Sequence, residues 1–491
     1  MTALASTGTV ARRAWIALAV VCLGQFMVVL DSTIVNVALD DIQADLHFSA
    51  AALTWVVNAY LVTFGSFMLV AGRVGDLVGR RRVFLAGVAL FTLASVACGF
   101  ADSQGLLIAA RFVQGIGGAV AFSVTIALIV SEFPNAADRA KAMSAYMFVA
   151  VGGGSVGLLL GGLIAQSVDW HWIFFINLPI GAATLLLGRA YIDEAEAIGT
   201  QGGVDWLGAL LVTVSLMLAV FAIVGTAEHG WGSAHTLGWG GAAIALFAAF
   251  IALEARIANP ILPLATFRVP GLSAAAAVRA FVFTGMFAVF FFGALYLEQI
   301  RGLSPLETGV AFLPMTLTVA ALSLGPVARL VVRFGPRPVL LGGIGTLIVG
   351  LVLFATAPGD VSYAPTLLVA FVVMGLGGGS TFVPLLTIAM AQVPPRDAGI
   401  ASGIMNVAMQ LGAALGLALL GALAEHRTAA RLADGASHQA AQLSGYHLAF
   451  ALGAAAAVVG LVLSVLVLRS PTAQPQPVAE PDAAQAEPQP A

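Results

Sequence analysis

The stretch that decides the fold reads Gly72-Arg73-Val74-Gly75-Asp76-Leu77-Val78-Gly79-Arg80-Arg81-Arg82. An apolar run from Ala50 to Ala71 precedes it, and a second apolar run from Val83 to Phe100 follows it. A helix needs roughly 20 apolar residues to cross a bilayer, and both runs have about that length. Arginine is concentrated in loops on the cytoplasmic side of a membrane. The stretch is therefore predicted to be a cytoplasmic hinge between two membrane-spanning helices.

The whole chain is too apolar for a soluble domain. Of its 491 residues, 60% are hydrophobic and 9% are charged, and the mean hydropathy is +0.99. No soluble fold covers that much apolar surface, so the bilayer must act as solvent. The cysteines, Cys22 and Cys98, both fall in apolar segments, which argues against a disulfide framework or a metal site. The net charge of −3 is too small to indicate an anionic partner such as nucleic acid.

Fourteen apolar stretches are predicted to be membrane-spanning helices. They lie near residues 14–39, 50–71, 83–100, 105–130, 142–166, 172–190, 205–226, 237–254, 272–297, 306–332, 338–357, 363–391, 398–424 and 445–468. With the N-terminus in the cytoplasm, almost every Lys and Arg outside the helices falls on the inner side, and the exceptions are Arg301, Arg427 and Arg431. That asymmetry follows the positive-inside rule. The largest external loop is then expected at residues 425–444.

Two pairs of similar segments indicate an internal repeat. Gly79-Arg80-Arg81 resembles Gly335-Pro336-Arg337, and Gly115-Ile116-Gly117-Gly118 resembles Gly375-Leu376-Gly377-Gly378, at nearly the same offset. The repeat predicts two six-helix bundles with an inserted pair of helices between them. The expected divisions are a cytoplasmic N-terminus (1–13), a first bundle (14–190), two linker helices (205–254), a second bundle (272–468) and a disordered, proline-rich cytoplasmic tail (469–491).

Asp31 is the residue that points most directly to a functional site, because it lies deep within the first predicted span. A carboxylate in hydrocarbon is costly unless it is paired, protonated or facing water, so Asp31 is either a proton or substrate site or part of a structural ion pair. Asp31 lies roughly 25 Å along its helix from the inner side, and Arg111 roughly 9 Å from the outer side of the fourth span. Both therefore fall at similar depth, and we expect them to meet. The alternative is an Arg111 that snorkels to the surface.

For other polar residues within the spans, the sequence leaves more than one role possible. Glu298, at the outer end of the ninth span, is either a second acidic site or an interfacial residue. Arg279 is expected to snorkel to the inner face. Asn406 and Gln410 share one helix face, as do Ser32 and Asn36; these polar stripes either line a solute path or join helices.

The fifth span contains small residues at a helical spacing, among them Gly153, Gly157, Gly161 and Gly162. They are expected to allow close helix packing, and a gating hinge is a further possibility. The formal G-x-S-x-G pattern there lies within a helix and lacks the strand that a hydrolase elbow needs. A P-loop is absent because the single lysine, Lys141, stands between alanines. Energy from an ion gradient is therefore expected, unless transport runs downhill.

Five stretches together resemble the fourteen-helix branch of the drug:proton antiporters in the major facilitator superfamily. They are Leu30–Leu39, Gly72–Arg82, Arg111–Gly118, Asp169–Pro179 and Tyr296–Pro305, and the likeness runs from about Ala14 to Arg469. The resemblance implies an all-α polytopic membrane protein with the major facilitator fold: two six-helix bundles plus two inserted helices.

The resemblance also assigns roles to particular residues. It implicates Arg111, in a motif that includes Gln114, in proton handling. It implies that the Gly72–Arg82 loop acts as a conformational latch through Gly72, Arg73, Asp76, Gly79 and Arg80. Four positions depart from the pattern. Leu158 stands where the antiporter motif of the fifth span usually has proline, and Glu298 replaces a usual glutamine. Leu77 and His171 stand where arginine is common.

The function so implied is proton-coupled efflux of lipophilic or cationic drugs across the bacterial inner membrane. Protons are then the coupling ion, no cofactor or metal is expected, the protein is not an enzyme, and a monomer is expected. One rival is a proton-coupled transporter of a single metabolite or of the host's own antibiotic. A second rival is a membrane sensor or scaffold that transports nothing.

Overall fold

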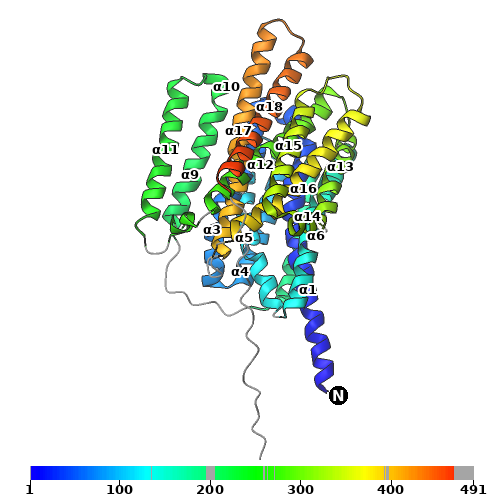
Figure 1. The fold of residues 1–491 in the computed structure, drawn as a ribbon, viewed down its shortest axis with the longest axis vertical. Coiled ribbons are helices and arrows are strands. Elements are labelled where there is room, and N and C mark those ends of the chain that lie inside the picture. Colours follow the sequence, from blue (N-terminus) through cyan, green and yellow to red (C-terminus); the bar gives the residue numbers. More distant parts are fainter. Residues whose placement is uncertain are drawn as a thin grey trace, which may run out of the picture.

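The computed structural model describes residues 2–133, 135–194, 205–257, 260–262, 264–269, 271–323, 325–391, 393 and 398–468. Figure 1 shows the long helices of these residues standing side by side along the length of the molecule. The tail predicted at 469–491 lies outside the described residues.

The helices fall into a first set, an inserted pair and a second set. The first set comprises α1 (Thr2–Ile34), η1 (Val35–Ala38), α2 (Leu39–Leu46), α3 (Ala50–Val78), α4 (Arg80–Gly99), α5 (Gln104–Glu132), α6 (Ala136–Ser167), α7 (Trp172–Phe175) and α8 (Asn177–Tyr191). The insertion comprises α9 (Trp206–Val224), α10 (Thr226–His229) and α11 (Ala234–Glu254), followed by η2 (Leu264–Arg268). The second set comprises α12 (Leu272–Leu295), η3 (Tyr296–Ile300), α13 (Pro305–Ser323), α14 (Pro326–Phe334), α15 (Pro336–Ala355), η4 (Tyr363–Leu367), α16 (Leu368–Met390), α17 (Ala398–Ala433) and α18 (His438–Leu466).

Thirteen helices of the described chain are long and apolar enough to cross a membrane. The sequence predicts one more, at 142–166, where the structure has the 32-residue helix α6. Within α6, the described apolar stretch is the shorter Val156–Ser167. The all-helical, polytopic fold that the sequence predicts is confirmed, with a span number close to fourteen.

The two sets of helices pack in the same pattern. In the first half, α1 packs on α6, and α4 packs on α5; in the second half, α12 packs on α17, and α15 packs on α16. The halves meet where α3 packs on α17 and where α6 packs on α13. The chain therefore forms two similar bundles that face one another.

The glycines of the sequence repeat occupy matching places in the two bundles. Gly79 joins α3 to α4 at φ +110°, and Gly335 joins α14 to α15 at φ +84°, a region that favours glycine because it has no Cβ. A Cβ at Gly117 would collide with the backbone of Phe91 on α4, and a Cβ at Gly377 would collide with the backbone of Leu347 on α15. The same close helix contact is thus built twice.

The inserted helices lie beside the interface between the two bundles. Helix α9 packs against α3 of the first bundle and α17 of the second, while α11 packs against α9. Figure 1 shows the pair as a green hairpin at one side of the molecule.

The external loop expected at 425–444 is mostly helical, so that prediction is wrong. Helix α17 continues to Ala433, and α18 begins at His438. The segment is rich in Ala, Arg and Leu, which favour helix, and its charges mark it as polar without breaking the helix. The chain turns at Gly435, which has φ +86°. Figure 1 shows the resulting α17–α18 hairpin rising beyond the neighbouring helices.

Candidate functional site

Asp31 and Arg111 form an ion pair inside the first bundle. Arg111 Nη1 lies 2.6 Å from Asp31 Oδ2, and the side chains are 1% and 0% exposed, respectively. The contact expected from their equal depth is therefore present, and Arg111 does not snorkel. Arg111 Nε also donates to the carbonyl of Val56 on α3 at 3.0 Å, and its guanidinium lies 4.5 Å from the centre of the Tyr60 ring.

Three uncharged polar residues complete the arrangement, which we call the Asp31 network: Asp31, Arg111, Gln114, Asn177 and Ser95. Gln114 Nε2 donates to Asp31 Oδ1 at 2.7 Å, and Asn177 Nδ2 donates to the same oxygen at 3.0 Å. Gln114 Oε1 accepts from Arg111 at 2.8 Å, and Asn177 also donates to Ser95 Oγ at 2.9 Å. Both carboxylate oxygens of Asp31 are thus hydrogen-bonded without water.

Local sequence explains how four helices, α1, α4, α5 and α8, bring these side chains together. Arg111 and Gln114 are three residues apart on α5 and therefore share one face. The break between α7 and α8 at Ile176 places Asn177 at the start of α8, with its side chain fully buried. Ser95 Oγ donates to the carbonyl of Phe174 at 2.8 Å, which holds that break against α4.

The network sets one positive charge directly against one carboxylate. Arg111 remains charged, because a guanidinium does not lose its proton in proteins. Its Nη1 lies 2.6 Å from Asp31 Oδ2 in a site from which solvent is excluded, so the two side chains are held as a buried pair.

Asn177 and Ser95 were missed by sequence reasoning. Asn177 belongs to a motif quoted above, but polar residues at the start of a helix usually serve as caps. The sequence signal that could have found Asn177 was the helix break beside it, close to the membrane-spanning helix that carries Asp31. Asn36, one helical turn beyond Ser32, lies outside the network: its Nδ2 donates to the carbonyls of Ser32 and Thr33 at 3.2 Å.

Glu298 lies apart from the network, where the two bundles touch. It sits on η3, is 7% exposed, and neither carboxylate oxygen has a hydrogen-bond partner among the described residues. The adjacent Gln299 donates to Asp40 Oδ1 at 2.6 Å and to Gln43 Oε1 at 2.9 Å, both on α2. We call this end of the molecule the α2 end. Glu298 is therefore a buried acid, and its role as a second acidic site or as an interfacial residue stays a prediction.

Asn406 and Gln410 lie on one face of α17 in the second bundle, and Gln410 is packed against α3. A Cβ added at Gly65 of α3 would lie 3.1 Å from Gln410 Cβ. Asn406 Oδ1 accepts from Arg279 Nη2 at 3.2 Å. Arg279 is 3% exposed, so the prediction that it snorkels is wrong: Phe382 covers the guanidinium, with its ring centre 4.7 Å away.

The latch residues are only partly described. The side chains of Arg73 and Asp76 lie outside the described residues, although their backbone continues α3. Gly75 packs against Val124 of α5, and a Cβ at Gly72 would lie 4.0 Å from Ser123 of that helix. Next to Gly79 and Arg80, Arg81 donates to the carbonyl of Arg189 at 2.5 Å, so the loop is tied to the end of α8.

The glycines of α6 lie against two different neighbours. Gly153, Gly157 and Gly161 face α1 so closely that a Cβ at each would touch its side chains or backbone. Gly162 faces the start of α13 in the other bundle. Close packing by this stripe is therefore present, and its use as a hinge stays a prediction.

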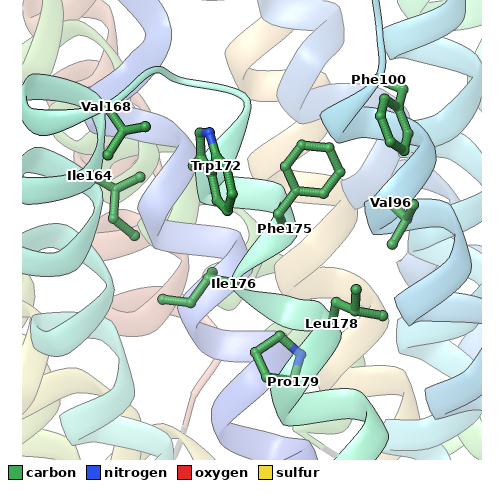
Figure 2. A pocket seen from close by; sticks show the side chains of 9 residues that line it. All are labelled: Val96, Phe100, Ile164, Val168, Trp172, Phe175, Ile176, Leu178 and Pro179. Atoms are coloured by element: carbon green, nitrogen blue, oxygen red, sulfur yellow. The ribbon is translucent and has the colours of Figure 1, made fainter.

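An apolar cavity of about 670 Å³ lies on the other side of the α7–α8 break. Figure 2 shows its lining, which is Val96, Phe100, Ile164, Val168, Trp172, Phe175, Ile176, Leu178 and Pro179. None of the predicted site residues lines it. Leu178 and Pro179 face the cavity, whereas the preceding residue, Asn177, faces Asp31.

The described chain forms two facing bundles of membrane-spanning helices, and the first bundle contains a buried charge network. This arrangement is typical of helical membrane transporters. The family model described as Major Facilitator Superfamily matches residues 21–416 and 275–490. The chain belongs to the Major Facilitator Superfamily.

Relatives of known name and solved structures agree with that assignment. The chain is 37% identical to the puromycin resistance protein pur8 of Streptomyces alboniger over 465 residues, covering 93% of this chain and 90% of the relative. It is 36% identical to the multidrug resistance protein Stp of Mycobacterium tuberculosis over 401 residues, covering 82% and 74%. An auto-inhibited peptide transporter of the POT family has the same fold, with a TM-score of 0.68 at 16% identity and coverage of 95% and 99%.

Proposed function

We propose that this protein exports lipophilic or cationic drugs and antibiotics in exchange for protons. The observation that carries the proposal is the Asp31 network: a membrane-buried acid held by an arginine that cannot lose its proton. Membership of a transporter superfamily, and relatives named for resistance to puromycin and to multiple drugs, support the export of small molecules. Neither a cofactor nor a metal enters the proposed mechanism, in which the proton is the coupling ion.

Coupling follows from alternating access by the two bundles. When the bundles rock, α5 shifts relative to α1, and Arg111 loosens its hold on Asp31. Asp31 then takes up a proton on one side of the membrane and releases it on the other as the pair re-forms. One proton moving through 100 mV yields about 2.3 kcal/mol, which drives a severalfold to tens-of-fold concentration of drug per cycle.

The other predicted residues have supporting roles in this scheme. Arg73, Asp76 and Arg80, with Gly72 and Gly79, form the latch that holds the bundles closed on the cytoplasmic side. The proposed location is the bacterial inner membrane, with both termini in the cytoplasm, because the arginine-rich loops then face inward. The protein is proposed to act there as a monomer.

Transport by the purified full chain in liposomes tests the proposal. Ethidium and puromycin are supplied with an imposed pH gradient, and wild type is compared with Asp31→Asn. Wild type is expected to accumulate the drug only while the gradient lasts, and Asp31→Asn is expected to fall to the level of empty liposomes. Equal accumulation with and without the gradient would contradict proton coupling.

A transporter for one antibiotic is the second candidate, since one relative is named for puromycin alone. A panel of unrelated dyes and antibiotics separates the two: a multidrug exporter moves several, and a dedicated one moves a single compound. A sensor or scaffold would move none of them.

A further inference from the structure

Arg279 of α12 is a buried cation without an acidic partner among the described residues. The two arginines described as buried are Arg111 and Arg279, which are 1% and 3% exposed. Arg111 is paired with Asp31, whereas no described carboxylate lies within 4.0 Å of Arg279. A charge buried in a membrane protein without a partner is costly, and such residues tend to have a function.

One guanidinium nitrogen of Arg279 is hydrogen-bonded and another has no partner among the described residues. Nη2 donates to Asn406 Oδ1 at 3.2 Å and contacts Met409 Sδ at 3.4 Å. Nε has no hydrogen-bond partner. An arginine edge with adjacent N–H donors matches a carboxylate, which it binds through two parallel hydrogen bonds.

The surroundings of Arg279 combine this polar edge with aromatic surface. The guanidinium lies 4.7 Å from the centre of the Phe382 ring and 5.7 Å from that of Phe283. Phe382 is itself 37% exposed, so a ring that covers the charge also reaches the surface of the described structure. A ligand that reaches Arg279 would displace or stack on this ring.

The site borders the surface where the two bundles meet. Asn406 lies one helical turn from Gln410, on the same face of α17. Gln410 is packed against Gly65 of α3, in the other bundle. Movement of the bundles therefore changes access to Arg279 directly.

We propose that Arg279 binds the carboxylate of a transported amphipathic acid, with Asn406 orienting the guanidinium and Phe382 and Phe283 contacting the apolar body. The inference rests on the proposed export function and adds singly charged organic acids to its substrates. The bound anion supplies the missing opposite charge, so the ionised acid binds in preference to an uncharged analogue.

A matched pair of probes tests this assignment: 1-pyrenebutyrate and its uncharged methyl ester. Binding of each to the purified full chain in detergent is measured by fluorescence titration. Wild type is expected to bind the acid about tenfold or more tightly than the ester, as loss of charged hydrogen bonds predicts. Arg279→Gln should abolish this preference, and Arg279→Lys should retain part of it. Arg333→Gln, the same change at an exposed arginine of α14, should retain all of it.

Equal binding of acid and ester by wild type, or a preference that persists in Arg279→Gln, would overturn the inference. If Arg279→Gln does not fold, Asn406→Ala replaces it, and a preference unchanged in that variant would count against the site. Gradient-driven ethidium uptake is measured on the same preparations. Uptake without any preference for the acid refutes the Arg279 site alone, whereas an Arg279-dependent preference without uptake of any drug refutes the export function and leaves the binding site standing.

Discussion

At the scale of single residues, Asp31 and Arg111 each keep the other from being an unpaired charge in a dry interior. Removing one partner of a buried pair costs about 3–5 kcal/mol, whereas replacing both with neutral groups is much less harmful. We therefore expect Asp31→Asn and Arg111→Gln each to lower the melting temperature. The double variant should melt closer to wild type than either single variant, although it remains uncoupled.

Thermal unfolding of the three variants, followed by light scattering and intrinsic fluorescence, checks this expectation. A double variant whose loss equals the sum of the single losses would show that the pair contributes no mutual stabilisation. Gln114 and Asn177, which both donate to Asp31 Oδ1, remain in place in all three variants.

Arg111 is also expected to set the pH range of transport. Arg111→Lys keeps a positive charge but not the planar fork that contacts Asp31, Gln114 and Val56, so partial drug efflux should remain. Arg111→Ala removes the positive charge that contacts Asp31, so the pH optimum of efflux should shift. The pH profile of efflux from everted vesicles measures this, and an unchanged profile in Arg111→Ala would remove Arg111 from proton handling.

The Asp31–Arg111 contact could be predicted from sequence, whereas the state of Glu298 and Arg279 could not. Depth along two antiparallel helices is a matter of counting residues, and it placed Asp31 and Arg111 at one level. Whether a polar residue near the end of a helix is buried depends on which other parts of the chain cover that residue. Glu298 is buried where η3 meets the other bundle, and Arg279 is covered by Phe382, a residue more than 100 positions away.

At the scale of helices, the glycines of α5 decide how closely α4 and α5 approach. We expect Gly117→Ala to destabilise the protein by about 1–3 kcal/mol, because the added methyl group meets the backbone of Phe91. Gly105→Ala, near the start of the same helix, has open space around its Cβ and should be neutral or slightly stabilising. Melting temperatures of the two variants provide the comparison, and equal losses would contradict the packing described.

The sequence predicted most helices well and one helix pair poorly. Hydropathy detects residues that face lipid, so it located the spans from Ala50 to Phe100 and their arginine-rich hinge. It does not detect a helix that continues into water. For that reason the sequence predicts a loop at 425–444, although the composition of this segment favours helix up to Gly435.

At the scale of the whole molecule, the described hydrogen bonds between the bundles lie at the α2 end. Gln299 links Asp40 and Gln43 on α2 to Tyr446 on α18, whose hydroxyl donates to Gln299 Oε1 at 2.6 Å. The backbone nitrogen of Ala51 also donates to Glu425 of α17. The bundles are thus held together at this end, which is the outer side in the proposed topology.

Gln299→Ala should therefore shift the population toward molecules open at the α2 end. The measurement is the distance distribution between spin labels at Ala44 and Ser362, two exposed positions on opposite bundles at this end. Gln439→Ala is the control, because Gln439 Nε2 donates to the carbonyl of Ile300 within one bundle. The distribution should broaden to longer distances in Gln299→Ala only; the same change in both variants would contradict a role for the inter-bundle bonds.

The central claim is that Asp31 exchanges a proton when a drug binds and the bundles move. Proton release into weakly buffered solution, recorded with a pH-sensitive dye as ethidium is added to the purified protein, tests it most directly. Wild type is expected to release protons in proportion to drug bound, and the Asp31→Asn/Arg111→Gln double variant is expected to release none while still binding drug. Undiminished release from that double variant would contradict the account, since the proton would then come from another group.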